Sequence, residues 1–137
     1  MRQCEAEARR WLAQAKSDLA FAEVGVREGF FAQACFICQQ AGEKALKALH
    51  YRRGARIVLG HSLAELLHDL VSDHPDLSDL RDAARQLDQY YIPTRYPNGL
   101  PGGVPAEAFS PRQAAEAVAY ARQFVARAGT ALGDGPH

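Results

Sequence analysis

The sequence has no excess charge of either sign. Its 137 residues carry 16 Lys and Arg against 16 Asp and Glu, so the formal net charge at pH 7 is zero. A strong nucleic-acid-binding protein generally presents a global positive field, which this chain lacks. Any site for a polyanion must therefore be local.

Hydrophobic residues make up 47% of the chain, which argues against wholesale disorder.

Long hydrophobic runs are also missing. No run approaches the roughly 18 apolar residues that a membrane span needs, and the first ten residues contain no apolar stretch of the signal-peptide kind. We therefore expect a cytoplasmic protein that does not associate with a membrane.

Cysteines and cofactor motifs are scarce. The chain has three cysteines, and Cys35 with Cys38 forms one C-x2-C pair, half of what a four-ligand zinc site needs. We expect reduced thiols packed in the core and no metal. A phosphate-binding glycine loop, a GxGxxG motif and a nucleophile elbow are all absent, so we expect no cofactor. The Gly-Ser signature of a nucleotidyltransferase is absent too, so the chain could not transfer nucleotides alone.

Helical periodicity dominates what is present. Apolar residues recur at spacings of three and four in five segments, and no segment alternates with period two. Ser62 with Glu65, and Ser110 with Gln113, form capping-box signatures at two helix starts. The expected helices cover about residues 8–26, 31–53, 62–70, 77–91 and 110–128.

These segments predict an all-α fold, an up-and-down antiparallel helical bundle of four to five helices. We expect a single domain over residues 1–137, with a core of about residues 5–128 and a flexible tail at 129–137. The one long connection, residues 92–109, holds four of the seven prolines. Connections longer than about 12 to 15 residues are usually functional or disordered, so a site is expected there first.

The second helix carries a candidate phosphate-binding face. Gln40, Glu43, Lys44 and Lys47 fall at spacings of three and four, so they share one side of the helix. The simpler alternative is a helix-stabilising pair between Glu43 and Lys47. From Lys44 to His61 the chain then contains no acid, and this basic segment could neutralise several phosphates. Its members are Lys44, Lys47, His50, Arg52, Arg53, Arg56 and His61. Basic residues near a helix C-terminus are, however, also favoured by the helix dipole.

Two further clusters could act on a nucleotide. One comprises three aromatic rings and a guanidinium, from Tyr90, Tyr91, Arg95 and Tyr96. They are suited to stacking a base and binding a phosphate, or alternatively to holding the loop against the core. His61 could serve as an acid or base, with Arg56 stabilising developing charge, which would suffice for metal-independent RNA cleavage. The alternative for His61 is a purely structural role before the Ser62 cap.

Several of these segments, in order, resemble one family. The segment QQAGEKALKAL at residues 39–49, then His61 with the Ser62 cap, then Arg95, Tyr96 and a proline resemble the HEPN family over about residues 11–128. The family loop usually reads Arg-Tyr-Pro-Asp, whereas this chain has Asn98 at the last position.

The resemblance implies a helical bundle that commonly forms a homodimer. Such proteins are often encoded beside a minimal nucleotidyltransferase, in a toxin–antitoxin-like pair, and were proposed to bind its nucleotide or substrate. Other members are ribonucleases with Arg, four to six residues, then His, which Arg56 and His61 satisfy. The usual tyrosine two positions on is Leu63 here, and the pair precedes the third helix instead of the last core helix.

Three hypotheses follow. The first is a non-catalytic nucleotide- or nucleic-acid-associated partner of a minimal nucleotidyltransferase, ranked first because no complete catalytic set is visible. Its candidate binding residues are Gln40, Lys44, Lys47, Arg53, Arg95, Tyr96 and Asn98. The second is a toxin ribonuclease that uses Arg56 and His61, and the third is a structural homodimer.

Overall fold

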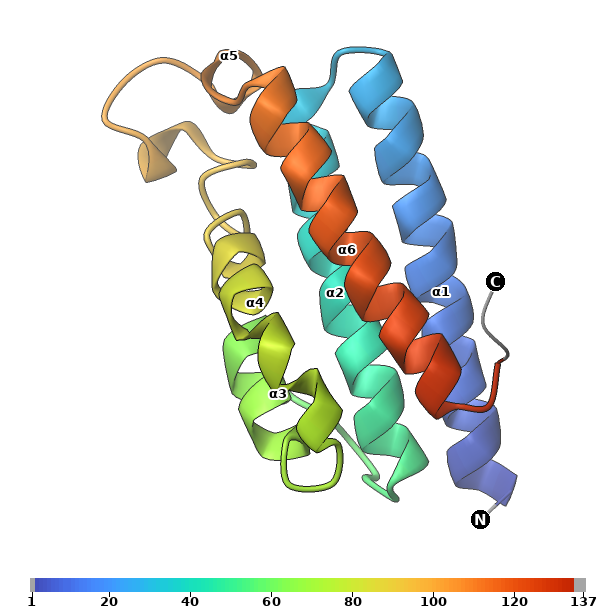
Figure 1. The fold of residues 1–137 in the computed structure, drawn as a ribbon. Coiled ribbons are helices and arrows are strands. Elements are labelled where there is room, and N and C mark those ends of the chain that lie inside the picture. Colours follow the sequence, from blue (N-terminus) through green and yellow to red (C-terminus); the bar gives the residue numbers. More distant parts are fainter. Residues whose placement is uncertain (1, 135–137) are drawn as a thin grey trace.

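The computed structural model describes residues 2–134, and these residues form helices without a strand. Three helices are long and the others are short (Figure 1). The elements are α1 (Arg2–Arg27), α2 (Phe31–Arg52), α3 (Leu63–Leu70), the 3-10 helix η1 (Pro75–Leu80), α4 (Arg81–Asp88), the 3-10 helix η2 (Pro97–Gly99), α5 (Pro105–Ala108) and α6 (Pro111–Ala131). The predicted all-α fold is confirmed.

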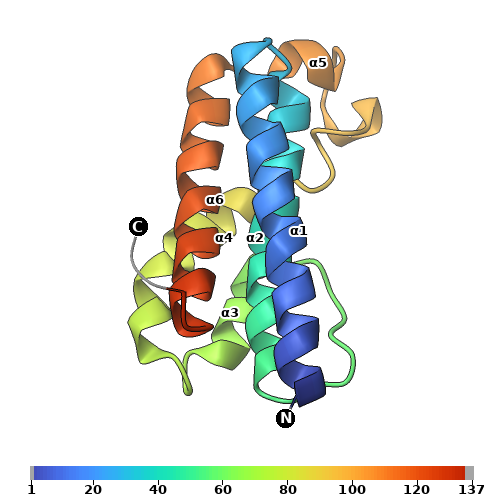
Figure 2. The ribbon, with the colours of Figure 1, turned by 90° about the vertical axis from the view of Figure 1, so that its right-hand side faces the viewer.

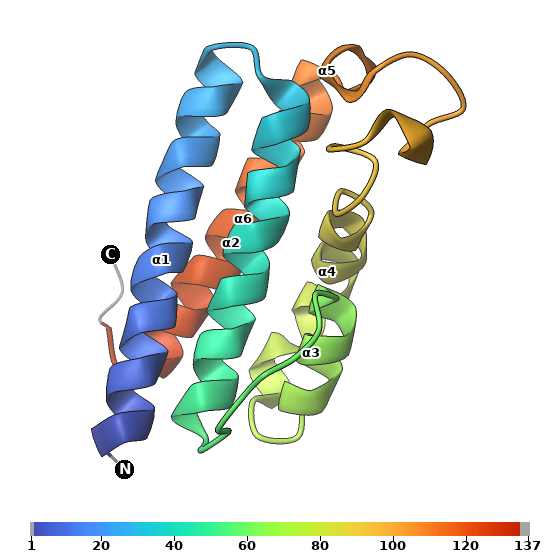
Figure 3. The same cartoon turned by 180° about the vertical axis from the view of Figure 1, so that it is seen from behind.

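Of the three long helices, α1 runs upward in Figure 1 and both α2 and α6 run downward, with α2 at the centre. Helix α1 is antiparallel to α2, and residues 53–62 then run back along α2 to the start of α3 (Figure 3). Helices α3 and α4 form a short hairpin on one side of α2, and α6 returns antiparallel to α1 (Figures 1 and 2). Helix α2 consequently packs against α1, α3, α4 and α6.

The central place of α2 follows from its small residues. Fifteen of its 22 residues are buried, so neighbouring elements cover it on most of its sides. Gly42 marks the closest approach, since a Cβ atom there would lie 2.5 Å from Leu63 Cδ2 and 3.3 Å from Leu87 Cδ1. A glycine at this position therefore lets the α3–α4 hairpin dock directly on α2.

Both predicted helix caps are present. The Ser110 hydroxyl accepts from the Gln113 amide at 3.1 Å, and the Gln113 side chain accepts from the Ser110 amide at 2.9 Å, which completes a capping box. At α3, the Ser62 hydroxyl accepts from the Glu65 amide at 3.2 Å. These local bonds satisfy amides that a helix leaves without partners.

The fourth expected helix differs from its prediction. The segment expected to form one helix over residues 77–91 begins as the 3-10 helix η1, and α4 ends at Asp88. The long connection also contains the short helices η2 and α5, with Pro105 buried.

The last helix is also longer than predicted. Helix α6 continues to Ala131 and Leu132 is only 4% exposed, so the expected tail does not begin at residue 129. Arg9 of α1 holds this end, because it donates to the Leu132 carbonyl and to Asp134 Oδ1, the latter at 2.7 Å. The last part of the predicted tail, residues 135–137, lies outside the described residues.

The cysteine pair lies in the core. Cys35 and Cys38 are buried and neither forms a disulfide. Burial raises the pKa of the Cys35 thiol to about 12 and raises the pKa of the Cys38 thiol still further, so both are protonated at neutral pH. Among the described helices, none has the length and hydrophobicity needed to cross a bilayer.

Candidate functional site

A buried carboxylate on α2 organises the polar side chains of the candidate site. Glu43 is 4% exposed. It accepts from Lys47 Nζ at 2.9 Å and from Gln39 Nε2 at 3.2 Å, one helical turn away on either side. Gln40 Nε2 adds a longer bond at 3.4 Å, and His61 Nδ1 lies 3.2 Å from the same carboxylate. A buried charge is tolerated only when paired in this way.

His61 is held in one orientation by three groups. Glu43 contacts its Nδ1, Gln39 donates to its backbone carbonyl at 2.8 Å, and its ring stacks on Tyr91 with centroids 4.7 Å apart. The His61 side chain is nevertheless 57% exposed, and its Nε2 makes no hydrogen bond within residues 2–134. A carboxylate on Nδ1 with a free Nε2 is the arrangement that acid–base histidines use.

Arg95, in the long connection, extends the candidate site beyond His61. Its guanidinium carbon lies 4.5 Å from the ring centroids of Phe36 and Tyr91 and 5.0 Å from that of Tyr96. Its Nε donates to the Tyr91 carbonyl at 2.7 Å, which leaves the terminal nitrogens for an anion. Tyr96 is 49% exposed, so its ring is accessible for stacking. Tyr91, Arg95 and Tyr96 of the predicted cluster therefore lie together, whereas Tyr90 is buried and its ring packs edge-on against Phe109.

Asp88 was not identified from the sequence, yet it fixes this region. Its carboxylate, at the end of α4, accepts from the Ser62 hydroxyl at 2.7 Å and from the amides of Leu63 at 2.6 Å and Ala64 at 3.2 Å. An acid is favourable at a helix N-terminus because the dipole is positive there. The partners lie about 25 residues apart, so local spacing gave no signal of the contact.

The predicted basic segment does not form one free surface. Lys44 Nζ lies 2.5 Å from Asp18 of α1, and Lys47 is buried against Glu43. Arg53 donates to the Asp69 carbonyl at 2.8 Å and also pairs with an acid of the α3–η1 turn. Acids from other elements thus neutralise Lys44 and Arg53, and Glu43 of the same helix neutralises Lys47.

The remaining predicted residues lie apart from one another. Arg56 lines a surface hollow with Arg10 of α1 and Tyr51 of α2, whereas the contacts of His61 are to Glu43 and Tyr91, so the structure does not join the predicted pair. Gln40 donates to Gln39 Oε1 at 2.7 Å. Asn98 is exposed in η2, where it makes no side-chain hydrogen bond within residues 2–134.

No group of three or more His, Cys, Asp or Glu side chains suited to a metal ion occurs in the described part of the chain. What the site offers is an oriented imidazole, a stacked guanidinium and exposed aromatic rings. These groups are suited to binding a base and a phosphate, and the imidazole is suited to proton transfer.

Comparison with known proteins gives one family and several solved structures. The HEPN domain family matches residues 8–130. The chain is similar to TT1696 from Thermus thermophilus, at 44% identity and a TM-score of 0.86, over 90% of this chain and 97% of that one. It is similar to ST0689, an archaeal HEPN homologue, at 31% identity and a TM-score of 0.76, over 92% and 98% of the two chains. It is similar to the HEPN domain protein TM0613 from Thermotoga maritima at 33% identity and a TM-score of 0.72, over 90% of this chain and 97% of that one. No match is found among curated proteins.

Proposed function

Because the chain belongs to the HEPN domain family, we propose that it is a non-catalytic, nucleotide- or nucleic-acid-associated subunit. Family membership by itself supports a nucleotide- or RNA-associated role. The observation that supports nucleotide binding by this chain itself is the surface formed by Arg95, Tyr96, Tyr91 and His61. There a cation and accessible rings meet on one side of the bundle.

The chemistry of this surface favours a single-stranded or mononucleotide ligand. Arg95 takes part in no ion pair within the described residues, so its charge is available to a phosphate. The exposed ring of Tyr96 can stack a base, and stacking of this kind tolerates any base sequence. The zero net charge of the chain limits binding to this local surface.

The resemblance adds two partners to the proposal. One is a minimal nucleotidyltransferase in a toxin–antitoxin-like pair, which would supply the catalytic motif that this sequence lacks. The other is a second copy of the chain, because HEPN proteins commonly form dimers. We place this assembly in the cytoplasm. Copurification of the two gene products would test the first partner.

Ligand binding is tested with ATP and a labelled single-stranded RNA in a titration followed by calorimetry or anisotropy. We expect Arg95→Ala to weaken binding by about tenfold or more, because a charged hydrogen bond and a stacked cation are both removed. The matched control is Arg112→Ala, since Arg112 is 90% exposed on α6. Equal loss in both variants would show binding by general charge only.

Ribonuclease activity is the second candidate, and the orientation of His61 by Glu43 favours it. Metal-chelated protein is incubated with tRNA and mRNA beside His61→Ala and Arg56→Ala. Discrete cleavage lost in both variants would establish the Arg-His ribonuclease. Cleavage lost only in His61→Ala would assign His61 without Arg56, and intact RNA would favour the non-catalytic subunit.

A further inference from the structure

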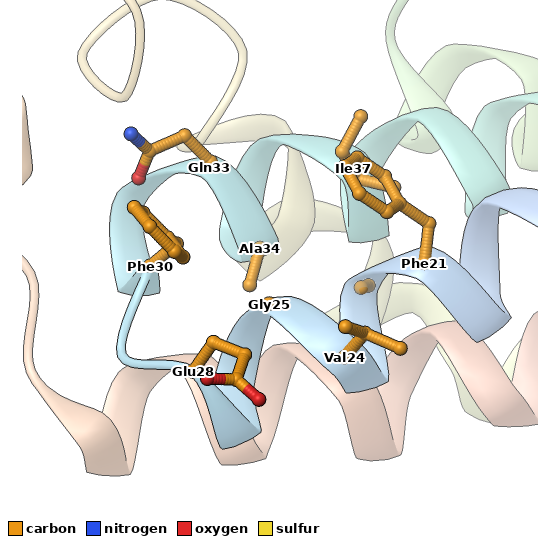
Figure 4. A pocket seen from close by; sticks show the side chains of 9 residues that line it. Phe21, Val24, Gly25, Glu28, Phe30, Gln33, Ala34 and Ile37 are labelled. Carbon is orange, nitrogen blue, oxygen red and sulfur yellow. The ribbon is translucent and has the colours of Figure 1, made fainter.

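An apolar groove opens between α1 and α2 where the two helices join (Figure 4). Its walls are Phe21 and Val24 from α1, Phe30 immediately before α2, and Ile37 in the second turn of α2. Its volume is about 320 Å³. Phe21 is 62% exposed and Phe30 is 56% exposed, although both are large and apolar. We call this feature the α1–α2 groove. Exposed apolar patches of this kind mark interaction surfaces.

The floor of the α1–α2 groove is made of small residues. Gly25 and Ala34 face each other, and a Cβ atom on Gly25 would lie 3.4 Å from Ala34 Cβ. Two small residues bring the helix backbones together and leave the flanking phenyl rings standing above them (Figure 4). Among residues 2–134, no side chain therefore fills the groove.

A second apolar feature lies on the segment between α2 and α3. Val58 points inward, where it packs against the core and its amide donates to the Tyr51 hydroxyl at 3.3 Å. Its neighbours Ile57 and Leu59 are 70% and 77% exposed. In an extended segment, alternate side chains point to opposite sides, so Ile57 and Leu59 point outward together. We call them the outward pair.

The segments that carry the α1–α2 groove and the outward pair lie beside one another on the side of the bundle away from α6. Figure 3 shows α1, α2 and residues 53–62 beside one another on the side nearest the viewer, with α6 behind them. Figure 2 agrees, because the 53–62 segment runs next to α1 and α2 there as well. The groove is at the junction of the two helices, whereas the outward pair is nearer their other end.

We propose that this side is the interface between two copies of the chain, with the outward pair of each copy seated in the α1–α2 groove of the other. The inference deepens the dimer of the proposed function and depends on it. A two-fold axis lying in the interface midway between the two features makes both contacts at once, which closes the assembly. A groove of this size has room for aliphatic side chains.

Charge supports a second copy as the occupant. Glu28 lies at the rim of the α1–α2 groove, and Arg56 immediately precedes Ile57 of the outward pair. Neither takes part in an ion pair between residues 2 and 134. Seating the outward pair in the groove brings this acid and this base together twice, once at each end of the interface.

The test is the dimer dissociation constant of the full chain, measured by sedimentation equilibrium over a range of concentrations. We expect Phe30→Glu and Leu59→Glu each to raise it by about tenfold or more, because each buries a carboxylate in an apolar contact. Val104→Glu is the matched control, since Val104 is 43% exposed in the long connection. Circular dichroism checks that the helices persist.

A charge exchange makes the test specific. Glu28→Arg or Arg56→Glu alone should weaken the dimer, and the two together should restore it, which only direct pairing predicts. A chain that stays monomeric at all concentrations overturns both this interface and the proposed dimer, while nucleotide binding remains to be judged by its own titration. A dimer unaffected by Phe30→Glu and Leu59→Glu, or equally weakened by Val104→Glu, overturns this interface alone.

Discussion

Two regions of α2 carry unusual side chains and treat them in opposite ways. Near the middle of the helix, Gln39, Glu43 and Lys47 are buried and polar, and each has a partner within the chain. At its N-cap, Phe30 is large, apolar and exposed at the α1–α2 groove. The polar row of Gln39, Glu43 and Lys47 therefore stabilises the fold within one chain, whereas we propose that the α1–α2 groove binds a second chain.

Breaking the polar row should have the largest effect on stability. Glu43→Ala leaves the Lys47 ammonium, whose side chain is 7% exposed, without its carboxylate. Removing one partner of a buried pair costs about 3 to 5 kcal/mol, and we expect a loss in this range from the free energy of unfolding in urea. Glu116→Ala is the control, because its partner Arg112 is 90% exposed and the pair is worth less than about 1 kcal/mol. A similar small loss for both variants would refute the role of the row.

The packing of the hairpin on α2 should give the next largest effect. Gly42→Ala places a methyl group 2.5 Å from Leu63 Cδ2, so the α3–α4 hairpin must shift. Overpacking costs about 1 to 3 kcal/mol, which exceeds the gain of up to about 1 kcal/mol from replacing a helical glycine. Thermal unfolding measures the change. Gly102→Ala is the control, since no atom lies within 4 Å of the added group.

The smallest expected effect is the pH dependence that His50, near the end of α2, gives to the free energy of unfolding. Burial lowers the pKa of His50, whose Nε2 lies 3.0 Å from the Leu66 carbonyl, so the folded state prefers the neutral imidazole. Its contribution to stability is therefore complete above the unfolded pKa of about 6.5 and is lost as pH falls below it. Urea unfolding from pH 7.5 to 5 should show this decline, and His50→Gln should flatten it. His68→Gln, at an exposed position of α3, should retain the decline.

Local patterns in the sequence were enough to predict the fold. Apolar spacing located the long helices, and the caps at Ser62 and Ser110 were read from residues three positions apart. Where the prediction was wrong, as at η1 or in the continuation of α6 past residue 129, long-range contacts decide the structure. Arg9 holding Asp134 is one example, and no spacing rule reveals a contact between the two ends of a chain.

The candidate site was only partly predictable for the same reason. The cluster around Arg95 is local in sequence, and its members do meet. The Glu43–Lys47 pair was the simpler alternative that the spacing offered, and it is present. The basic segment failed as one surface also because Asp18 of another helix pairs with Lys44, a contact that the spacing did not indicate. Helical spacing tells which residues share a face, but it does not tell which charges that face will meet.

Asp88 links the candidate site to the α3–α4 hairpin, so we expect the two to unfold locally as one unit. Its carboxylate clamps the first turn of α3 to the end of α4, and Tyr91, on which His61 stacks, follows three residues later. If the hairpin leaves α2, the clamp, the imidazole and the stacked ring leave with it, while α1, α2 and α6 can stay together. The amides of residues 61–66 and 84–91 should therefore exchange with solvent in concert.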